Sequence, residues 1–104
     1  MNRIPRSTVA ALALLCCAAA AQAQDTNLAR NLAATCANCH GTNGNARGDM
    51  PPLAGVSAER IIAAVNDYKS GNRPATVMHQ ISKGYTDAQL QLIAAYFAAQ
   101  KPAK

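Results

Sequence analysis

The 104-residue chain predicts an all-α fold. No stretch alternates apolar and polar residues as a half-buried strand does, whereas apolar residues recur at the i, i+3 and i+4 spacings of helices. Hydroxyl residues and glycines stand where those segments begin and end, as helix caps do. The aromatic side chains are sparse, so the chain has little bulk of its own for a core: Tyr68, Tyr85, Tyr96 and Phe97.

The first 23 residues are typical of a secretory signal peptide, which leaves residues 24–104 as one mature domain. Arg3 and Arg6 precede an apolar run that ends in the small-x-small pattern 21–23. The run falls short of the about 20 apolar residues that a membrane-spanning helix needs. We therefore expect export to the periplasm and no integral membrane segment after cleavage. A lipid anchor on Cys16 or Cys17 is a weaker alternative, because no small residue precedes either cysteine in the way that lipidation requires.

Much of the positive charge belongs to the presequence. The whole chain carries a formal +5, and residues 24–104 keep eight Lys/Arg and five Asp/Glu, a formal +3. No basic stretch is interleaved with aromatic residues, so the pattern argues against a nucleic-acid partner. Most of the lysines of the mature part are expected to be solvated, and the alternative is that they help to steer an acidic partner: Lys69, Lys83, Lys101 and Lys104.

The first predicted helix of the mature part begins after Thr26, which can cap it. Leu28 and Leu32 repeat at i, i+4 and lead directly to Cys36. Four glycines, two prolines and two asparagines then predict a long irregular loop over residues 41–55. A loop of this length in a small domain is expected to wrap around something or to serve a function.

Ser57 is expected to cap a second helix, with Glu59 in its first turn and Gly71 at its end. Its spacing predicts a buried stripe of Ile61, Val65 and Tyr68.

Pro74 is expected to open a short third helix that runs through Ser82 and closes with Lys83 and Gly84. Residues 86–89 form a capping-box pattern for a terminal helix. One face of that helix is predicted to carry Leu90, Ile93 and Phe97. The last four residues are expected to be a frayed tail.

The strongest chemical signal is C-x-x-C-H at Cys36, Cys39 and His40. Two thiols three positions apart on a helix face the same way, so both can add to the two vinyl groups of one haem. The adjacent imidazole is then placed to bind the iron. A thioredoxin-like dithiol lacks the βαβ pattern that it needs, and a zinc site lacks two further ligands. The motif therefore predicts one covalent haem c, whose bulk would complete the core.

The second axial ligand of the iron has three candidates, Met50, Met78 and His79. A thioether favours Fe(II), so a methionine ligand raises the reduction potential. Met78 lies far enough beyond His40 for the chain to reach the opposite face of a haem, and it precedes the final helix. Met50 can also span the distance, at about 3.4 Å per residue. His79 points about 100° away from Met78 if that segment is helical. We predict Met78.

These features together resemble class I cytochrome c over essentially all of the mature chain. The resemblance rests on the haem motif, the segment 51–55, a methionine before a capped terminal helix, and residues 94–97 within it. The second half of the mature chain resembles a narrower group within this class. Residues 68–71, 76–78, 81–86 and 95–97 resemble the monohaem cytochrome subunit of flavocytochrome c sulfide dehydrogenase.

The resemblance implies the class I fold, helices wrapped around one covalent haem, and a role for each matching residue. Cys36 and Cys39 would form the thioethers, and His40 and Met78 would be the axial iron ligands. Pro51 matches the proline whose carbonyl accepts the Nδ1 hydrogen of the histidine, which fixes the imidazole orientation. Tyr96 matches an aromatic residue through which the terminal helix packs on the first. In most class I members the distal methionine lies in an irregular loop, whereas here its flanks look helical.

An iron bound on both sides has no open position for substrate, so the expected function is one-electron transfer and not catalysis by this chain. The resemblance points to a flavoprotein sulfide dehydrogenase subunit as the electron donor. An alternative is a freely diffusing cytochrome that delivers electrons to an oxidase or another acceptor. A haem enzyme or gas sensor, in which Met78 leaves the iron, is a weaker alternative with His79 as its only nearby acid or base.

Overall fold

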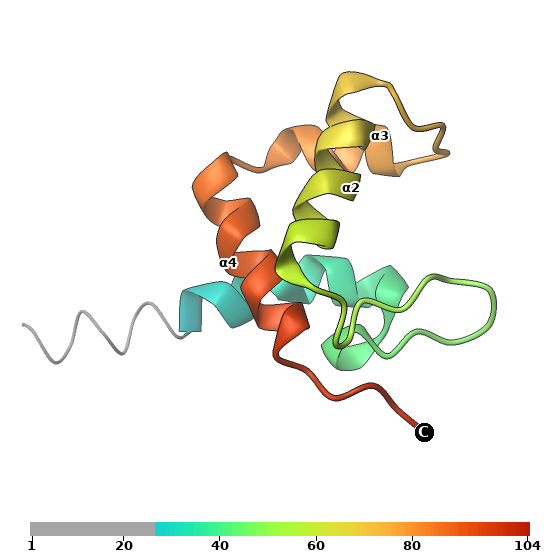
Figure 1. Ribbon diagram of the computed structural model, residues 1–104, viewed down its shortest axis with the longest axis vertical. Helices are drawn as coiled ribbons and strands as arrows, with labels where there is room; N and C mark the ends of the chain where they lie inside the picture. The colour runs from blue at the N-terminus through green and yellow to red at the C-terminus, as the bar shows by residue number, and fades with distance from the viewer. Residues whose placement is uncertain (1–26) are drawn as a thin grey trace, which may run out of the picture.

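A computed structural model describes residues 27–104 of the protein (Figure 1). The predicted signal peptide, its cleavage site, Cys16, Cys17 and the capping role of Thr26 lie outside the described residues. Within the described part the all-α prediction is confirmed, since it contains helices and no strand. The elements are the N-terminal helix, helical from residue 27 to residue 40, then η1 (Thr42–Gly44), α2 (Ala58–Ser70), α3 (Met78–Ile81), η2 (Ser82–Gly84) and α4 (Asp87–Ala98). None of these helices is long and apolar enough to cross a membrane.

The caps predicted for α2 and α4 are confirmed. The Ser57 hydroxyl accepts a hydrogen bond from the Arg60 N–H at 3.4 Å, and Gly71 ends α2 in the left-handed conformation, with φ 80°. At the start of α4 the capping box is complete. The Gln89 N–H donates to the Thr86 hydroxyl at 3.2 Å, and the Thr86 N–H donates to the Gln89 side chain at 3.0 Å. Each end is therefore set by residues within one helical turn.

The core lies where the N-terminal helix, α2 and α4 meet, and α2 also packs against α3 (Figure 1). Its buried members include Ala33 from the N-terminal helix, Ile61 from α2, and Ile93 and Phe97 from α4. Tyr96 packs edge-on against Phe97, with ring centroids 5.4 Å apart, and its hydroxyl donates to the Asn43 side chain at 2.7 Å. Tyr96 thus joins the terminal helix to the loop that follows the N-terminal helix.

The prediction of a third helix from Pro74 is wrong. Residues 74–77 are irregular, and α3 begins only at Met78, where the Gln80 and Ile81 N–H groups donate to the Val77 carbonyl. Three consecutive residues, 75–77, line a cavity. A helix would turn each successive side chain by about 100°, so it could not present all three to one cavity. At its other end α3 tightens into η2, and Gly84 is not a left-handed cap.

The prediction of a frayed tail is also wrong, and Lys69 is an exception to the expectation that most lysines are solvated. The tail is not frayed, because the Asn45 side chain donates to the Lys101 carbonyl at 3.3 Å and accepts from the Ala103 N–H at 2.6 Å. Lys69 is not simply solvated. Its ammonium donates to the Tyr85 carbonyl at 2.8 Å, which joins α2 to the segment before α4. The Asn45 amide therefore joins the 41–55 loop to the tail, and the Lys69 ammonium joins α2 to the segment before α4.

Candidate functional site

A cavity of about 360 Å³ opens beside the core and takes its walls from every main part of the described chain. The N-terminal helix contributes both cysteines of the motif and His40, and the 41–55 loop contributes Pro51 and Leu53. Apolar side chains of α2 and α4 form the floor, among them Ile61, Val65, Leu90 and Ile93. The stripe predicted for α2 therefore faces this cavity as much as the core: Ile61 is buried, whereas Val65 and Tyr68 are half-buried and line it.

The two thiols of the motif lie on the last turn of the N-terminal helix. Cys36 is half-buried, and Cys39 is exposed. Burial raises the pKa of the Cys36 thiol. A backbone hydrogen bond offsets part of this rise, and the neighbouring Cys39 thiolate adds a smaller increase of the pKa. Both are free thiols, and no group of three His, Cys, Asp or Glu side chains among residues 27–104 is arranged to hold a metal ion.

The ring of His40 is oriented by the loop that follows it. Its Nδ1 lies 2.7 Å from the Pro51 carbonyl oxygen, and because a carbonyl only accepts, Nδ1 carries the proton and donates. The other ring nitrogen, Nε2, is then the unprotonated one that can bind a metal. The loop is itself held in place, since the Leu53 and Ala54 N–H groups both donate to the Gly44 carbonyl, at 2.9 and 3.1 Å.

Gly44 is required where the loop closes. It is buried with φ 77°, and a Cβ there would lie 2.6 Å from the Ala54 backbone nitrogen and 2.8 Å from the Phe97 ring. Only glycine fits both the left-handed conformation and the close approach. The carbonyl that accepts from His40 is therefore positioned by tight packing of the loop against α4.

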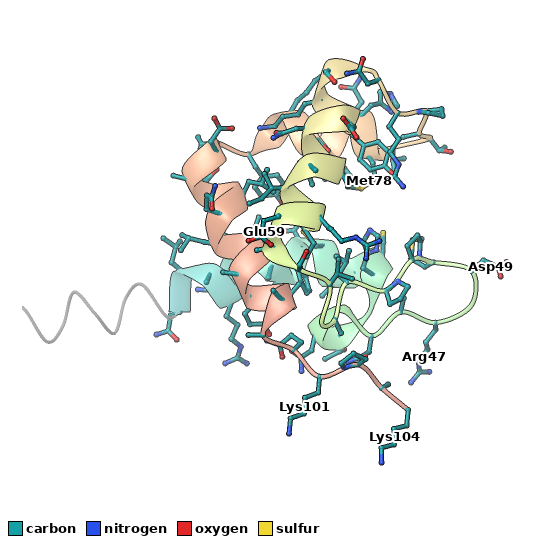
Figure 2. All side chains as sticks on the ribbon, viewed as in Figure 1. Arg47, Asp49, Glu59, Met78, Lys101 and Lys104 are labelled. Carbon is teal, nitrogen blue, oxygen red and sulfur yellow. The ribbon has the colours of Figure 1, made fainter. Side chains whose placement is uncertain are left out.

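The structure separates the three candidates for the second iron ligand. Met78 is half-buried, lines the cavity and is the first residue of α3. In the view of Figure 2 its label lies on the side of α3 that faces the 41–55 loop. Met50 also lines the cavity, but it is 40% exposed and directly precedes Pro51 on the histidine side. His79 is not among the lining residues. It is half-buried, and its Nδ1 is buried without a hydrogen-bond partner. The assignment of Met78 stays a prediction.

Sequence reasoning missed the residues at the mouth of the cavity. Val77 is 54% exposed and Ile81 is 38% exposed, and both line the opening together with Met50 and Arg73. The i, i+4 spacing of Val77 and Ile81 indicates a helix face but does not indicate that this face borders a cavity, and a lone arginine looks like any other solvated charge. Only the turn after α2 brings them to one place.

The residues present fit a haem. The cavity walls are almost entirely apolar, its two thiols and an imidazole come from one helix end, and the largest side chain fully buried by the protein itself is Phe97. The described chain thus encloses less apolar bulk than a domain of its size needs, and it leaves a cavity of suitable character beside its small core.

Comparison with known proteins agrees with this chemistry. The family described as "Cytochrome C oxidase, cbb3-type, subunit III" matches residues 23–97. The cytochrome subunit of sulfide dehydrogenase of Chlorobaculum tepidum is 47% identical over 66 residues, which are 64% of this chain and 60% of that protein. Cytochrome c4 of Pseudomonas aeruginosa is 35% identical over 102 residues, which are 97% of this chain and 50% of that protein. The chain thus spans only part of the length of these relatives.

A solved structure, cytochrome c4 of Acidithiobacillus ferrooxidans, superposes on the fold with a TM-score of 0.59 at 39% sequence identity. The match covers 62% of this chain and 37% of that one. The arrangement of helices around the cavity is therefore that of class I cytochromes c.

Proposed function

The chain belongs to the class I c-type cytochromes, electron-transfer proteins that carry covalent haem c, and from this premise we propose that it is a periplasmic one-electron carrier with a single haem. One observation carries the proposal. Cys36, Cys39, His40 and Met78 come from two segments of the chain and all line the same apolar cavity.

The protein's own residues have distinct parts in this function. Cys36 and Cys39 would attach the haem as thioethers, and His40 and Met78 would bind its iron. The haem, when bound, would supply an iron that changes between Fe(II) and Fe(III). Pro51 keeps the His40 ring oriented with Nε2 free, and the mostly apolar walls disfavour water in the cavity.

The proposed electron donor is a flavoprotein subunit that oxidises sulfide. The support is the 47% identity to a cytochrome subunit of sulfide dehydrogenase, together with the exposed apolar residues around the cavity mouth, where a redox partner can approach. A second candidate is a diffusing cytochrome that delivers electrons to an oxidase, and the match to a family described as an oxidase subunit supports an oxidase as its partner.

The first experiment establishes the cofactor and its ligands. The full chain is expressed in a bacterium that attaches haem c, and the exported protein is expected to have the mass of residues 24–104 plus one haem. A Met78→Ala variant is expected to keep the haem, to lose the low-spin methionine-ligated spectrum and to fall in reduction potential. Met50→Ala is the matched control and is expected to retain the wild-type spectrum. An unmodified chain, or loss of the methionine spectrum in Met50→Ala alone, would overturn the assignment.

The second experiment identifies the partner. Recovery of the protein from its native periplasm with a bound flavoprotein, and reduction of its haem by sulfide only when that flavoprotein is present, would support the subunit function. A monomer that is oxidised by a purified terminal oxidase would support the diffusing carrier. Carbon monoxide binding to the reduced wild-type protein at neutral pH would instead indicate a sensor or enzyme.

A further inference from the structure

Arg73 is the only lysine, arginine, aspartate or glutamate among the residues that line the cavity. The other lining side chains are apolar or uncharged, apart from the His40 imidazole. Arg73 is exposed, so its guanidinium stands at the mouth and not in the interior. Any negative charge on a group held in this cavity therefore has one cation of the lining within reach.

The Arg73 side chain is held at that position. Its guanidinium carbon lies 5.1 Å from the centroid of the Tyr68 ring, and Tyr68 lines the same cavity. Its backbone N–H donates to the Asp67 carbonyl at 3.3 Å, after the left-handed turn at Gly71, and Pro74 restricts the backbone on its other side. Little conformational freedom is then lost when the guanidinium binds a ligand.

The guanidinium has no carboxylate partner of its own within the described residues. The ion pair found there, between Lys69 and Asp87, involves other groups. Stacking on an aromatic ring leaves the N–H donors at the edge of the guanidinium plane available, and that edge matches the two oxygens of a carboxylate. The arrangement is thus suited to an anion at the cavity mouth.

We propose that Arg73, stacked on Tyr68, binds the propionate carboxylates of the haem and thereby raises the reduction potential of the protein. This inference rests on the proposed function. A haem carries its vinyl groups and its propionates at different edges. Figure 1 shows the segment that follows α2 at the opposite end of that helix from the N-terminal helix, which holds Cys36 and Cys39. The cysteines bind one edge, and Arg73 binds the other.

The effect on potential follows from Coulomb's law. Propionate charge stabilises Fe(III) over Fe(II), and a fixed cation beside the propionates offsets that charge. Removing the cation disfavours reduction, by about two- to sixteenfold in the redox equilibrium for charges about 10 Å apart at effective dielectric constants between that of water and that of a protein surface. That range corresponds to about 18–71 mV for one electron.

The test compares three arginines in the haem-loaded protein. Arg73→Gln is expected to lower the potential by this amount. Arg60→Gln on α2 and Arg47→Gln on the loop remove the same charge from exposed sites outside the lining, and both are expected to shift the potential by much less. Figure 2 shows Arg47 directed outward from the loop. Arg73→Lys is expected to recover part of the loss, whereas Arg73→Met, which keeps only the packing stem, is expected to recover none.

Each variant is first checked for haem by mass and for methionine ligation by its spectrum, so that failure of the proposed function is recognised separately. A wild-type chain without haem would overturn both proposals. Haem-loaded Arg73→Gln with the wild-type potential, or with a shift equal to that of Arg60→Gln, would overturn the role of Arg73 alone. Recovery by Arg73→Met would show that Arg73 acts only through its packing on Tyr68.

Discussion

The two sides of the cavity are built in different ways. On the histidine side, backbone and side-chain hydrogen bonds connect the loop to itself and to α4, including Leu53 and Ala54 to Gly44 and Gly55 to Phe97 at 2.9 Å. On the methionine side, residues 71–77 are exposed and irregular, and α3 is a single turn whose first residue is Met78. Backbone hydrogen bonds therefore define the position of His40, whereas the position of Met78 depends more on packing and on the bound group. We expect the methionine side to open first when the protein is destabilised.

The largest expected effect comes from breaking the histidine side at Gly44. Gly44→Ala places a Cβ in contact with backbone and the Phe97 ring at a φ of 77°, so we expect a loss of about 2–5 kcal/mol from overpacking and left-handed strain. Gly48→Ala is the control, because Gly48 also has a positive φ, of 63°, but has nothing within 4 Å of the added Cβ. Denaturant unfolding of both haem-loaded variants measures the difference. Equal losses would mean that the loop is not tightly packed.

A smaller effect is expected on the methionine side from Lys69→Met, which keeps the apolar stem but removes the donor to the Tyr85 carbonyl. The partly exposed bond should contribute about 1–2 kcal/mol. Methionine ligation, followed by its spectrum, should be lost at lower denaturant concentration than in the wild type.

Asp87→Asn is the matched control for Lys69. It removes the 3.8 Å ion pair with Lys69, in which the Asp87 carboxylate is 95% exposed, and it leaves the hydrogen bond to Tyr85 in place. It also removes the one carboxylate in the first turn of α4. Its effect should be below about 1 kcal/mol, because an exposed pair is weak and screened by salt and an exposed carboxylate at a helix N-terminus contributes little. A loss in Asp87→Asn as large as that in Lys69→Met would show that charge, and not the bond to Tyr85, stabilises this side.

The smallest expected effect is that of Asn45→Ala, which removes both hydrogen bonds to the tail and should cost about 0.5–1.5 kcal/mol, since these bonds are exposed. Asn66→Ala, at an exposed position of α2, controls for the loss of an amide. The absorption spectrum of the haem, which reports the ligands of its iron, should not change in either variant. A change of haem ligation in Asn45→Ala would show that the tail supports the loop around Pro51 more strongly than its contacts indicate.

Sequence reasoning predicted the helices well where the signal was local. The caps at Ser57, Gly71 and Thr86 stand where the pattern placed them, and so does the buried face of α4. It was wrong at Pro74. A proline favours the start of a helix, but residues 75–77 all line the cavity, and a helix could not turn three consecutive side chains toward it. Sequence reasoning was also wrong about the tail, and it did not foresee the hydrogen bond of Lys69, because the partners of both lie in distant segments.

In the candidate site, too, local features could be predicted from the sequence, whereas contacts between distant segments could not. The spacing of Cys36, Cys39 and His40 implies haem attachment without any structure, because all three lie within five consecutive residues. Met78 was predicted from its distance along the chain beyond His40 and its place before the final helix, whereas the role of Pro51 was predicted only from a resemblance, and Arg73 was not predicted.

What the amino-acid sequence determined by itself is therefore the local chemistry: the haem motif, the helix caps and the small apolar content that leaves space for a cofactor. Only the tertiary structure decided which distant residues share the cavity wall. It turned His40 toward Pro51 and placed Arg73 beside Tyr68 at the mouth. The physical reason is the distance along the chain over which each feature is determined. A helix cap or the haem motif depends on residues within about one helical turn, whereas a cavity wall depends on how separate helices pack.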